Sequence, residues 1–282
     1  MGKLYVVGSP IGNLGDLSPR AVETLRSADF IAAEDTRVTR KLLHHFGVST
    51  PMVSYHEHNR RESGAAVLRR VQAGESCALV TDAGMPAISD PGEDLVRACH
   101  EAGVPVESVP GPVAFATALA LSGFPGGRFP FEGFLSVNKR GRREHLDSLK
   151  DETRTMLFYE APHKLPGTLR DFASAFGPRP LAIVRELTKL HEQVIRTTCE
   201  EAARRWGKPP SEGGSDGSLK GEIVLVLAGA APARAEPMPL EEAVAIAKAN
   251  LARGMGASEA AKQAAQASGR RKSEIYGAMS NI

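Results

Sequence analysis

Short apolar runs alternate with longer amphipathic segments along the first 122 residues. The apolar runs are rich in Val, Ile, Leu and Ala and predict strands at residues 4–7, 30–33, 52–54, 77–80 and 104–109. The segments between them predict helices at residues 19–27, 60–72, 93–101 and 113–121. Because strands and helices alternate in this way, we expect a parallel sheet flanked by helices.

The pattern changes after residues 122–127, where glycine and proline predict a hinge. Strands are then predicted at residues 155–159, 181–184, 192–196 and 223–227, and helices near residues 139–150, 164–176 and 199–206. Residues 209–218 are predicted to form a polar loop. The sequence therefore predicts an α/β protein with two domains, at residues 1–122 and 123–232.

Three Ala-rich helices are predicted beyond these domains, at residues 240–252, 257–267 and 270–279. They belong to a predicted extension over residues 237–282. A Ser-Gly turn separates the last two, and three cations open the final one, so the pair resembles a helix-turn-helix unit. A small helical cap packed on the rest of the protein is the alternative.

Composition narrows the class of protein only slightly. The chain has 282 residues, 42% hydrophobic content and a formal net charge of +2, as in an ordinary globular protein, so charge alone does not indicate nucleic-acid binding. No apolar run approaches the roughly 18 residues of a membrane span, and no signal-peptide pattern is present, so we expect a cytoplasmic protein. Three widely spaced cysteines indicate free thiols rather than a disulfide framework.

The loop at residues 81–92 (TDAGMPAISDPG) follows a predicted buried strand and precedes a predicted helix. Ligands of open α/β sheets bind at such loops, outside the carboxyl ends of strands. Glycines and prolines give the loop an irregular path with accessible carbonyl oxygens, while Asp82 and Asp90 add negative charge. This lining suits a cation better than a phosphate, and the sequence lacks a G-x-x-x-x-G-K-[ST] phosphate loop.

A series of motifs, in order along the chain, resembles the rRNA branch of the tetrapyrrole methylase superfamily. The resemblance covers about residues 3–229 and is carried by the loop at 81–92 together with 7–14 (VGSPIGNL), 33–37 (AEDTR), 55–59 (YHEHN), 109–112 (VPGP), 131–135 (FEGFL), 158–163 (FYEAPH), 185–189 (RELTK) and 221–222 (GE). It implies a two-domain fold with S-adenosylmethionine (SAM) in the cleft between the domains.

The resemblance also implies an activity and partners. The activity is SAM-dependent 2′-O-methylation of a cytidine ribose in the decoding region of 16S rRNA, on assembled or partly assembled 30S particles, by a homodimer. Methylation of a tetrapyrrole or another small molecule is the alternative within the same enzyme class. A non-catalytic RNA-binding or assembly protein that has kept the fold is a third hypothesis.

Candidate cofactor-binding residues lie in these motifs. Asp82 and the loop carbonyls are expected to hold the methionine end of SAM, as the resemblance also implies. The full set of expected cofactor residues is Pro10, Asp82, Gly84, Ala87, Ile88, Ser89, Val113, Ala114, Ala161, Leu187 and Gly221.

Candidate catalytic residues are the ionisable groups at the predicted crevice. A ribose hydroxyl is a poor nucleophile near neutral pH, so a base that accepts its proton is expected to help. The candidates are Glu34, Asp35, His56, Glu160 and Glu186, with Glu34 or Glu160 preferred. Lys189 is a candidate for stabilising negative charge on the oxygen. Ordinary structural ion pairs are the alternative for each of them.

Polar and cationic residues give candidate RNA contacts. Arg37, Lys41, His56 and Asn59 are expected to face the substrate, with a solvated helix face as the alternative. The strongest cluster is Lys139, Arg140, Arg142 and Arg143, which could neutralise phosphates; Arg270, Arg271 and Lys272 form another. The two histidines at 56 and 58 lack a third clustered ligand, so no metal site is predicted.

Overall fold

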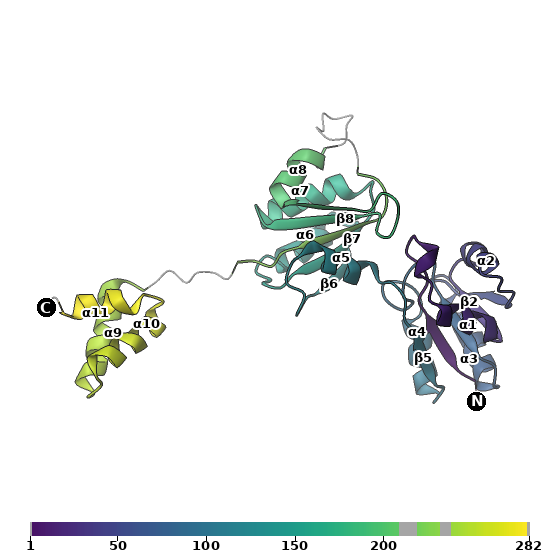
Figure 1. The fold of residues 1–282 in the computed structure, drawn as a ribbon, viewed down its shortest axis with the longest axis horizontal. Coiled ribbons are helices and arrows are strands. Elements are labelled where there is room, and N and C mark those ends of the chain that lie inside the picture. The colour runs from purple at the N-terminus through teal and green to yellow at the C-terminus, as the bar shows by residue number, and fades with distance from the viewer. Residues whose placement is uncertain (1, 209–218, 232–237, 281–282) are drawn as a thin grey trace. The chain divides into compact units, whose positions relative to one another are not determined.

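The computed structural model describes residues 2–208, 219–231 and 238–280, which form two compact units, Met1–Ala230 and Ala231–Ile282 (Figure 1). The first unit carries two five-stranded sheets, and the second is helical. The loop predicted at 209–218 and the predicted junction at 232–237 lie outside the described residues.

The first sheet is wholly parallel, as the alternating pattern predicts. Its strands are β1 (Leu4–Val7), β2 (Phe30–Ala33), β3 (Met52–Ser54), β4 (Cys77–Val80) and β5 (Val106–Val109), in the order β3-β2-β4-β1-β5. The helices of this half are α1 (Pro19–Ser27), α2 (Thr36–His45), α3 (Arg60–Gln72) and α4 (Glu93–Glu101), with a short 3-10 helix at Leu14–Asp16. Two separate apolar clusters bury β2 and β4 completely.

Helix α2 was not predicted from the sequence pattern. Asp35 caps it, because its carboxylate accepts the Arg37 backbone N–H at 2.8 Å. Thr39 and Leu43 are the buried residues of this helix. The helix therefore begins at the carboxyl end of β2, and it places Arg37 and Lys41 on one polar helix.

The second sheet is mixed. Its strands are β6 (Phe131–Phe134), β7 (Met156–Glu160), β8 (Pro180–Arg185), β9 (Gln193–Thr198) and β10 (Ile223–Leu227), in the order β6-β7-β10-β8-β9. Only β6 and β7 pair in parallel. The sequence pattern missed β6, a short strand with an irregular register at Gly133 and no fully buried residue.

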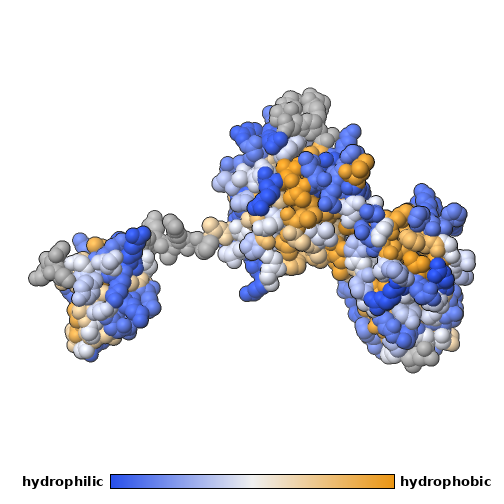
Figure 2. All heavy atoms as spheres, viewed as in Figure 1, coloured by the Kyte–Doolittle hydropathy of each residue, from blue (hydrophilic) through white to orange (hydrophobic). Residues whose placement is uncertain are grey.

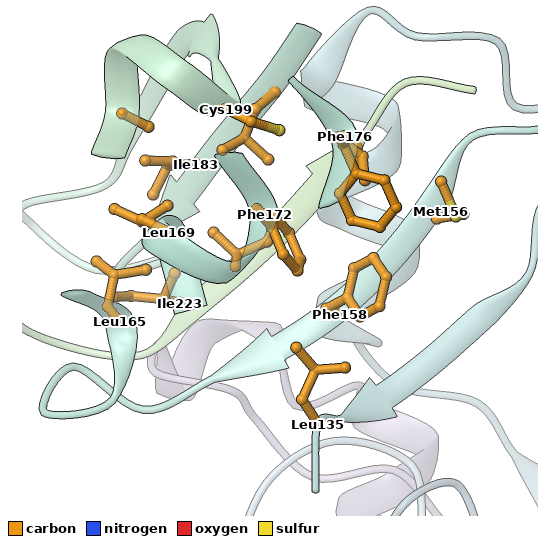
Figure 3. Close-up of a cluster of buried hydrophobic side chains, with 14 of the residues drawn as sticks. Leu135, Met156, Phe158, Leu165, Leu169, Phe172, Phe176, Ile183, Cys199 and Ile223 are labelled. Carbon is orange, nitrogen blue, oxygen red and sulfur yellow. The ribbon is translucent and has the colours of Figure 1, made fainter. Parts of the chain in front are cut away.

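Three helices share an apolar core with this sheet, and aromatic rings join one of them to β7. These helices are α6 (Lys139–Ser148), α7 (Leu165–Phe176) and α8 (Cys199–Trp206). Figure 3 shows Phe158 of β7 beside Phe172 and Phe176 of α7. The ring centroids of Phe158 and Phe172 lie 5.1 Å apart, and those of Phe172 and Phe176 lie 5.4 Å apart, in edge-to-face contacts that are favourable for buried aromatic pairs.

An apolar cluster joins α5 (Ala114–Ser122) and the loop after β1 to the second sheet. Helix α5 contacts β7, β8, β9 and β10, and Ile11 packs with Leu157 and Leu187 in the same cluster. Gly8 and Gly111 bring the loops after β1 and β5 into backbone contact: a Cβ added to Gly8 would lie 2.5 Å from the Gly111 nitrogen. Side chains cannot fit there, so glycine is required at both positions.

The second unit consists of α9 (Leu240–Ala252), α10 (Ala257–Ser268) and α11 (Lys272–Ser280). Its core is built mainly from small side chains, with Ala243, Ala247, Ala261 and Ala264 buried around Ile275. Figure 2 shows many hydrophilic residues on the visible face of this unit. Its helices therefore bury a common apolar core, which is what a helix-turn-helix unit and a helical cap both require.

All three thiols are buried in the first unit. Burial raises the pKa of Cys77 and of Cys199 to about 12, and it raises the pKa of Cys99 as well. No helix within the described residues combines the length and apolarity needed to cross a membrane.

Candidate active site

The central loop, residues 81–92, is fixed by the loop that follows β1. The Ser9 N–H donates to the Gly84 carbonyl at 2.9 Å, and the Gly84 N–H donates back to the Ser9 carbonyl at 3.1 Å. The Ser9 hydroxyl, which is buried, also donates to the Thr81 carbonyl at 3.0 Å. Three hydrogen bonds thus set the path of the loop at the carboxyl ends of β1 and β4.

Backbone strain is concentrated in two loops at this cleft. Among the described residues, the non-glycine positions with positive φ are Ala87 (65°), Ser89 (64°), Glu186 (53°) and Thr188 (66°). Left-handed backbone at such residues costs of order 1–3 kcal/mol each and is tolerated where surrounding contacts impose it. The strain indicates that both loops are held in a conformation that serves the cleft rather than local stability.

The cleft has a cavity volume of about 400 Å³, within the range of small-molecule sites. Both halves of the first unit contribute to it, through the central loop, the start of α5, the end of β7 and the start of β10. Its lining is mostly apolar and comprises Ile11, Ala83, Gly84, Met85, Ile88, Ser89, Asp90, Val113, Ala114, Phe134, Tyr159, Glu160, Ala161, Pro162, Leu187, Glu222, Ile223 and Val224.

Carboxylates cluster at the central loop. Burial, reinforced by Glu34 and Asp82, raises the pKa of Asp90 from its usual 3.8 to about 6. Burial also raises the pKa of Glu34 and that of Asp82. The Glu34 carboxylate accepts the Asp82 N–H at 3.2 Å, and Asp82 accepts the Asp35 N–H at 3.1 Å. The cluster makes this part of the cleft attractive to a cation.

Asp82 faces a second, smaller cavity of about 280 Å³. Pro10 and Lys41 also line this cavity, so two expected cofactor residues and one expected RNA contact lie together there. Arg37 is paired with Asp35 at 2.6 Å, and hydrogen bonds from Arg37 hold the pKa of Asp35 well below its usual range. Asp35 therefore stays ionised and serves the helix cap and this ion pair, which makes it a poor proton acceptor.

Glu160 lines the cleft, but both of its carboxylate oxygens accept hydrogen bonds from within the protein. Its side chain is buried, one carboxylate oxygen accepts the Ala161 N–H at 2.8 Å, and the other accepts the Thr168 hydroxyl of α7. Arg142 donates to the same Thr168 hydroxyl at 2.7 Å. Glu160 thus ties the end of β7 to α7, a structural role that its acidic motif alone did not reveal.

Glu186, Lys189 and Glu222 form a second charged group at the strained 185–189 loop. The Lys189 ammonium lies 3.0 Å from Glu186 and 3.3 Å from Glu222. The hydrogen bond from Lys189 lowers the pKa of Glu186. Burial alone would lower the pKa of Lys189, but the two glutamates outweigh it and raise the pKa. Lys189 therefore remains charged beside the cleft.

The expected cofactor residues divide into three groups. Seven of them line the cleft: Gly84, Ile88, Ser89, Val113, Ala114, Ala161 and Leu187. Pro10 and Asp82 line the smaller cavity, while Ala87 and Gly221 shape loops without lining the cleft. A Cβ added to Gly221 would lie 2.0 Å from a Glu186 carboxylate oxygen, so Gly221 allows Glu186 to pack close.

Sequence reasoning missed several residues of the cleft. These are Ile11, Met85, Phe134, Tyr159 and Glu222. Each of these five stands inside a motif already noted, so its place in that motif was the available signal. Asp90, whose charge was noted in the sequence, also lines the cleft. The Tyr159 hydroxyl accepts the Phe115 N–H at 3.3 Å, and the Phe134 ring lies 5.5 Å from that of Tyr159.

Some of the expected RNA contacts are engaged by hydrogen bonds or ion pairs within the protein. Asn59 accepts the His56 N–H at 2.8 Å and donates to the Ser54 carbonyl, so it shapes its own turn. Arg142 is only 13% exposed and binds Asp171 at 2.5 Å. Arg270 donates to the Met238 carbonyl.

The remaining cations lie nearer to solvent. Arg140 pairs with Glu144 at 2.8 Å on the exposed side of α6, and Lys272 donates to Ser258 at 2.7 Å. Lys139, Arg143 and Arg271 are exposed.

Comparisons with known proteins agree with this fold. Residues 3–203 match the family described as Tetrapyrrole (Corrin/Porphyrin) Methylases. The chain belongs to this family of methyltransferases, which confirms the resemblance carried by the motifs.

Within the family, the chain is similar to proteins named Ribosomal RNA small subunit methyltransferase I. The relative from Synechocystis sp. is 46% identical over 277 residues, covering 98% of this chain and 96% of the relative. The relative from Escherichia coli O157:H7 is 40% identical over 278 residues, covering 98% and 93%. The relative from Thermotoga maritima is 45% identical over 229 residues, covering 81% of this chain but 99% of the relative.

Solved structures share the fold at low sequence identity. Uroporphyrin-III C-methyltransferase from Thermus thermophilus, in complex with S-adenosylhomocysteine, has a TM-score of 0.54 and 20% identity, and the match covers 80% of this chain and 97% of that one. A diphthine synthase has a TM-score of 0.58 and 14% identity, with coverage of 81% and 90%. The tetrapyrrole methylase fold predicted from the motifs is therefore confirmed, while the predicted division at residue 122 lies inside one compact unit, Met1–Ala230.

Proposed function

We propose that this protein is a SAM-dependent methyltransferase that acts on ribosomal RNA, and that its acceptor is the 2′-hydroxyl of a cytidine in the decoding region of 16S rRNA. One observation carries the choice of RNA over a tetrapyrrole. The chain aligns over 98% of its length, at 40–46% identity, with relatives named for ribosomal RNA methylation. The enzymes of tetrapyrrole synthesis that share the fold reach 20% identity or less.

The cleft fits SAM by its chemistry. The adenosyl group suits the apolar walls formed by Ile88, Val113 and Leu187, and the positively charged sulfur suits the acidic group around Asp90. Bound SAM supplies a methyl group that is already activated by its sulfonium. The protein therefore has to position the acceptor, exclude water and receive a proton, and alignment alone can be worth effective molarities of about 10⁵–10⁸ M.

Asp90 is the group we assign as proton acceptor. It lines the cleft, and its pKa is about 6. A general base is most effective when its pKa lies close to the working pH. Neither Glu160, with both oxygens engaged, nor Asp35, held by Arg37, meets both conditions. Asp90 would accept the proton of the ribose hydroxyl while that oxygen takes the methyl group that bound SAM would supply.

The other charged groups take supporting roles in this proposal. Lys189, held by Glu186 and Glu222, stays cationic at the cleft edge and can stabilise negative charge on the acceptor. Burial raises the pKa of Asp90, and the charges of Glu34 and Asp82 raise it further. The enzyme acts in the cytoplasm as a homodimer, on 30S subunits, as its resemblance to the rRNA branch implies.

The test is methyl transfer from radiolabelled SAM to three acceptors: purified 30S subunits, naked 16S rRNA and a uroporphyrinogen. A 16S rRNA in which the target cytidine is replaced by 2′-deoxycytidine serves as the matched control. Label on the ribosomal RNA and its absence from the deoxy control support ribose methylation. Label that persists on the deoxy control refutes the 2′-oxygen, and label on the uroporphyrinogen alone refutes RNA as the substrate.

A further inference from the structure

A third cavity, apart from the cleft and the smaller cavity at Asp82, lies between α6 and α7 and has a volume of about 1010 Å³. Its lining differs from that of the cleft because most of its residues are polar or charged. The lining includes six lysines and arginines and one histidine against two aspartates: Lys139, Arg142, Arg143, Lys150, Lys164, Arg170, His163, Asp147 and Asp171. We call this cavity the α6–α7 groove.

Half of these cations already have partners. Arg142 binds Asp171, Lys150 binds Asp147 at 2.7 Å, and Arg170 donates to the Gly207 carbonyl. The two aspartates of the groove are therefore neutralised within the protein.

Three cations are left for a ligand. Lys139, Arg143 and Lys164 are exposed, and none has an ion-pair partner among the described residues. Lys139 and Arg143 are four residues apart on α6, so they project from the same face of that helix. Lys164 comes from the opposite wall, just before α7. Three unpaired cations that line one concave surface are a favourable site for several phosphates.

The groove shares two walls with the cleft. At the end of β6, Phe134 lines the cleft, while Ser136 and Val137 of the loop that follows line the groove. In the turn after β7, Ala161 and Pro162 line the cleft, and His163 and Lys164 line the groove. A polymer that placed one unit in the cleft would therefore pass directly into the groove, whereas a free nucleotide or a tetrapyrrole would not reach both.

We propose that the α6–α7 groove binds the backbone phosphates of the RNA strand next to the nucleotide that enters the cleft. The identity of the strand rests on the proposed function; the groove itself rests on its charge and its shared walls. Lys139, Arg143 and Lys164 hold the phosphates. Arg142 instead supports the groove from within, through Asp171 and Thr168. The groove thus fixes the register of the strand without reading its sequence.

The experiment uses the full-length protein and an RNA fragment that spans the decoding region of 16S rRNA. Binding is measured against salt concentration for wild type, for the single variants Lys139→Ala, Arg143→Ala and Lys164→Ala, and for the triple variant. Each single-strand phosphate that a variant no longer neutralises should reduce the slope of log K against log salt by about 0.7, so the triple variant should reduce it by about 2. SAM affinity, measured by calorimetry, should not change.

Two matched controls make the test specific to the groove. Arg69→Ala removes an exposed cation from α3, and its salt slope should equal that of wild type. Arg140→Ala removes a neighbouring cation that does not line the groove, and it should weaken RNA binding less than Arg143→Ala does. Equal effects of Arg140→Ala and Arg143→Ala would overturn the groove in favour of a diffuse basic surface. An unchanged slope in the triple variant would overturn it outright.

Methyl transfer to 30S subunits, measured with the same variants, separates this proposal from the proposed function. We expect the triple variant to raise KM at least tenfold with little change in kcat. A wild-type enzyme that binds RNA through these residues but transfers no methyl to it would refute the function and leave the groove standing. Methyl transfer that none of the three substitutions changes would refute the groove and leave the proposed function standing.

Discussion

Replacement of Asp90 by asparagine should stabilise the protein at neutral pH while removing most of its activity. The substitution keeps the size of the side chain and removes a charge that the cleft disfavours. A carboxyl whose folded-state pKa lies above its unfolded value weakens the native state once it ionises. That cost is absent below about pH 4, grows as the pH rises, and is complete above the folded pKa of about 6.

The magnitude follows from the rise of the pKa from 3.8 to about 6. A tenfold change in proton affinity corresponds to about 1.4 kcal/mol, so the upper limit is about 3 kcal/mol. Asp90 is only partly buried, and solvent screens part of this cost, so a gain of roughly 1–3 kcal/mol in the free energy of unfolding is expected at pH 7.5. At pH 4 the variant and wild type should have nearly equal stability.

Urea unfolding at pH 4, 5.5 and 7.5 measures the stability, and single-turnover methyl transfer measures the chemistry. Loss of a general base should slow transfer by about 10²–10⁴-fold, and the wild-type rate should fall as the pH drops below about 6. SAM affinity should change much less than the rate. Higher stability at an undiminished rate would show that Asp90 is buried in the cleft but does not accept the proton.

Asp35→Asn is the control of opposite sign. Arg37 lowers the pKa of Asp35, so its ionised form stabilises the native state above the unfolded pKa, and this contribution disappears as the pH falls. The Asp35 variant should therefore be less stable than wild type at pH 7.5 and similar to it in acid. If both variants shifted stability in the same direction at pH 7.5, the electrostatic account of the cleft would be refuted.

Four further changes test other parts of the site. Glu160→Gln should lower the free energy of unfolding in urea by about 1–3 kcal/mol, because a buried hydrogen-bond acceptor is lost. The rate of methyl transfer should stay within tenfold of wild type. A large fall in rate at unchanged stability would instead assign Glu160 as the base. Gly8→Ala should abolish SAM binding in calorimetry or prevent folding, because the new Cβ meets the Gly111 backbone; normal binding would refute this close approach. Phe134 is 60% exposed at the cleft, and stacking of its ring on a base would contribute about 1–3 kcal/mol. Phe134→Ala should therefore raise KM for RNA about 5–150-fold, and Phe134→Trp should leave KM unchanged. Equal effects of the two substitutions would exclude stacking. A chain ending at Ala230 should retain SAM affinity, because the Thermotoga maritima relative aligns over 99% of its length with only 229 residues; a fall in affinity would assign the helical unit a part in the cleft.

The sequence pattern predicted the strands that are buried on both sides and the loops that follow them. Continuous apolar runs such as those of β4 and β10 allow little else, and ligand sites of parallel sheets lie at the carboxyl ends of strands. Short β6 escaped prediction because it has no fully buried residue, whereas α2 escaped although it is amphipathic, with Thr39 and Leu43 buried on one face. Figure 2 shows hydrophobic patches at the surface of the first unit among hydrophilic residues.

Roles of individual charged residues were harder to predict because they depend on distant partners. Glu160 and Asp90 stand in equally suggestive motifs, yet Thr168 of α7 engages one while burial raises the pKa of the other. Arg142 and Arg143 are adjacent, yet one points inward and the other into solvent. Here a signal existed: Arg142 is four residues before buried Leu146 on α6 and so shares its inner face.

The burial of Cys77, Cys99 and Cys199 has a practical consequence for watching this enzyme at work. A thiol whose pKa is about 12 has almost no thiolate at neutral pH, and the thiolate is the form that reacts with alkylating probes. The native cysteines should therefore react little with alkylating probes, so that an introduced cysteine can be labelled selectively. A cysteine introduced at Val137, which is 79% exposed, would carry a fluorophore at the rim of the groove and report the arrival of each RNA strand in real time.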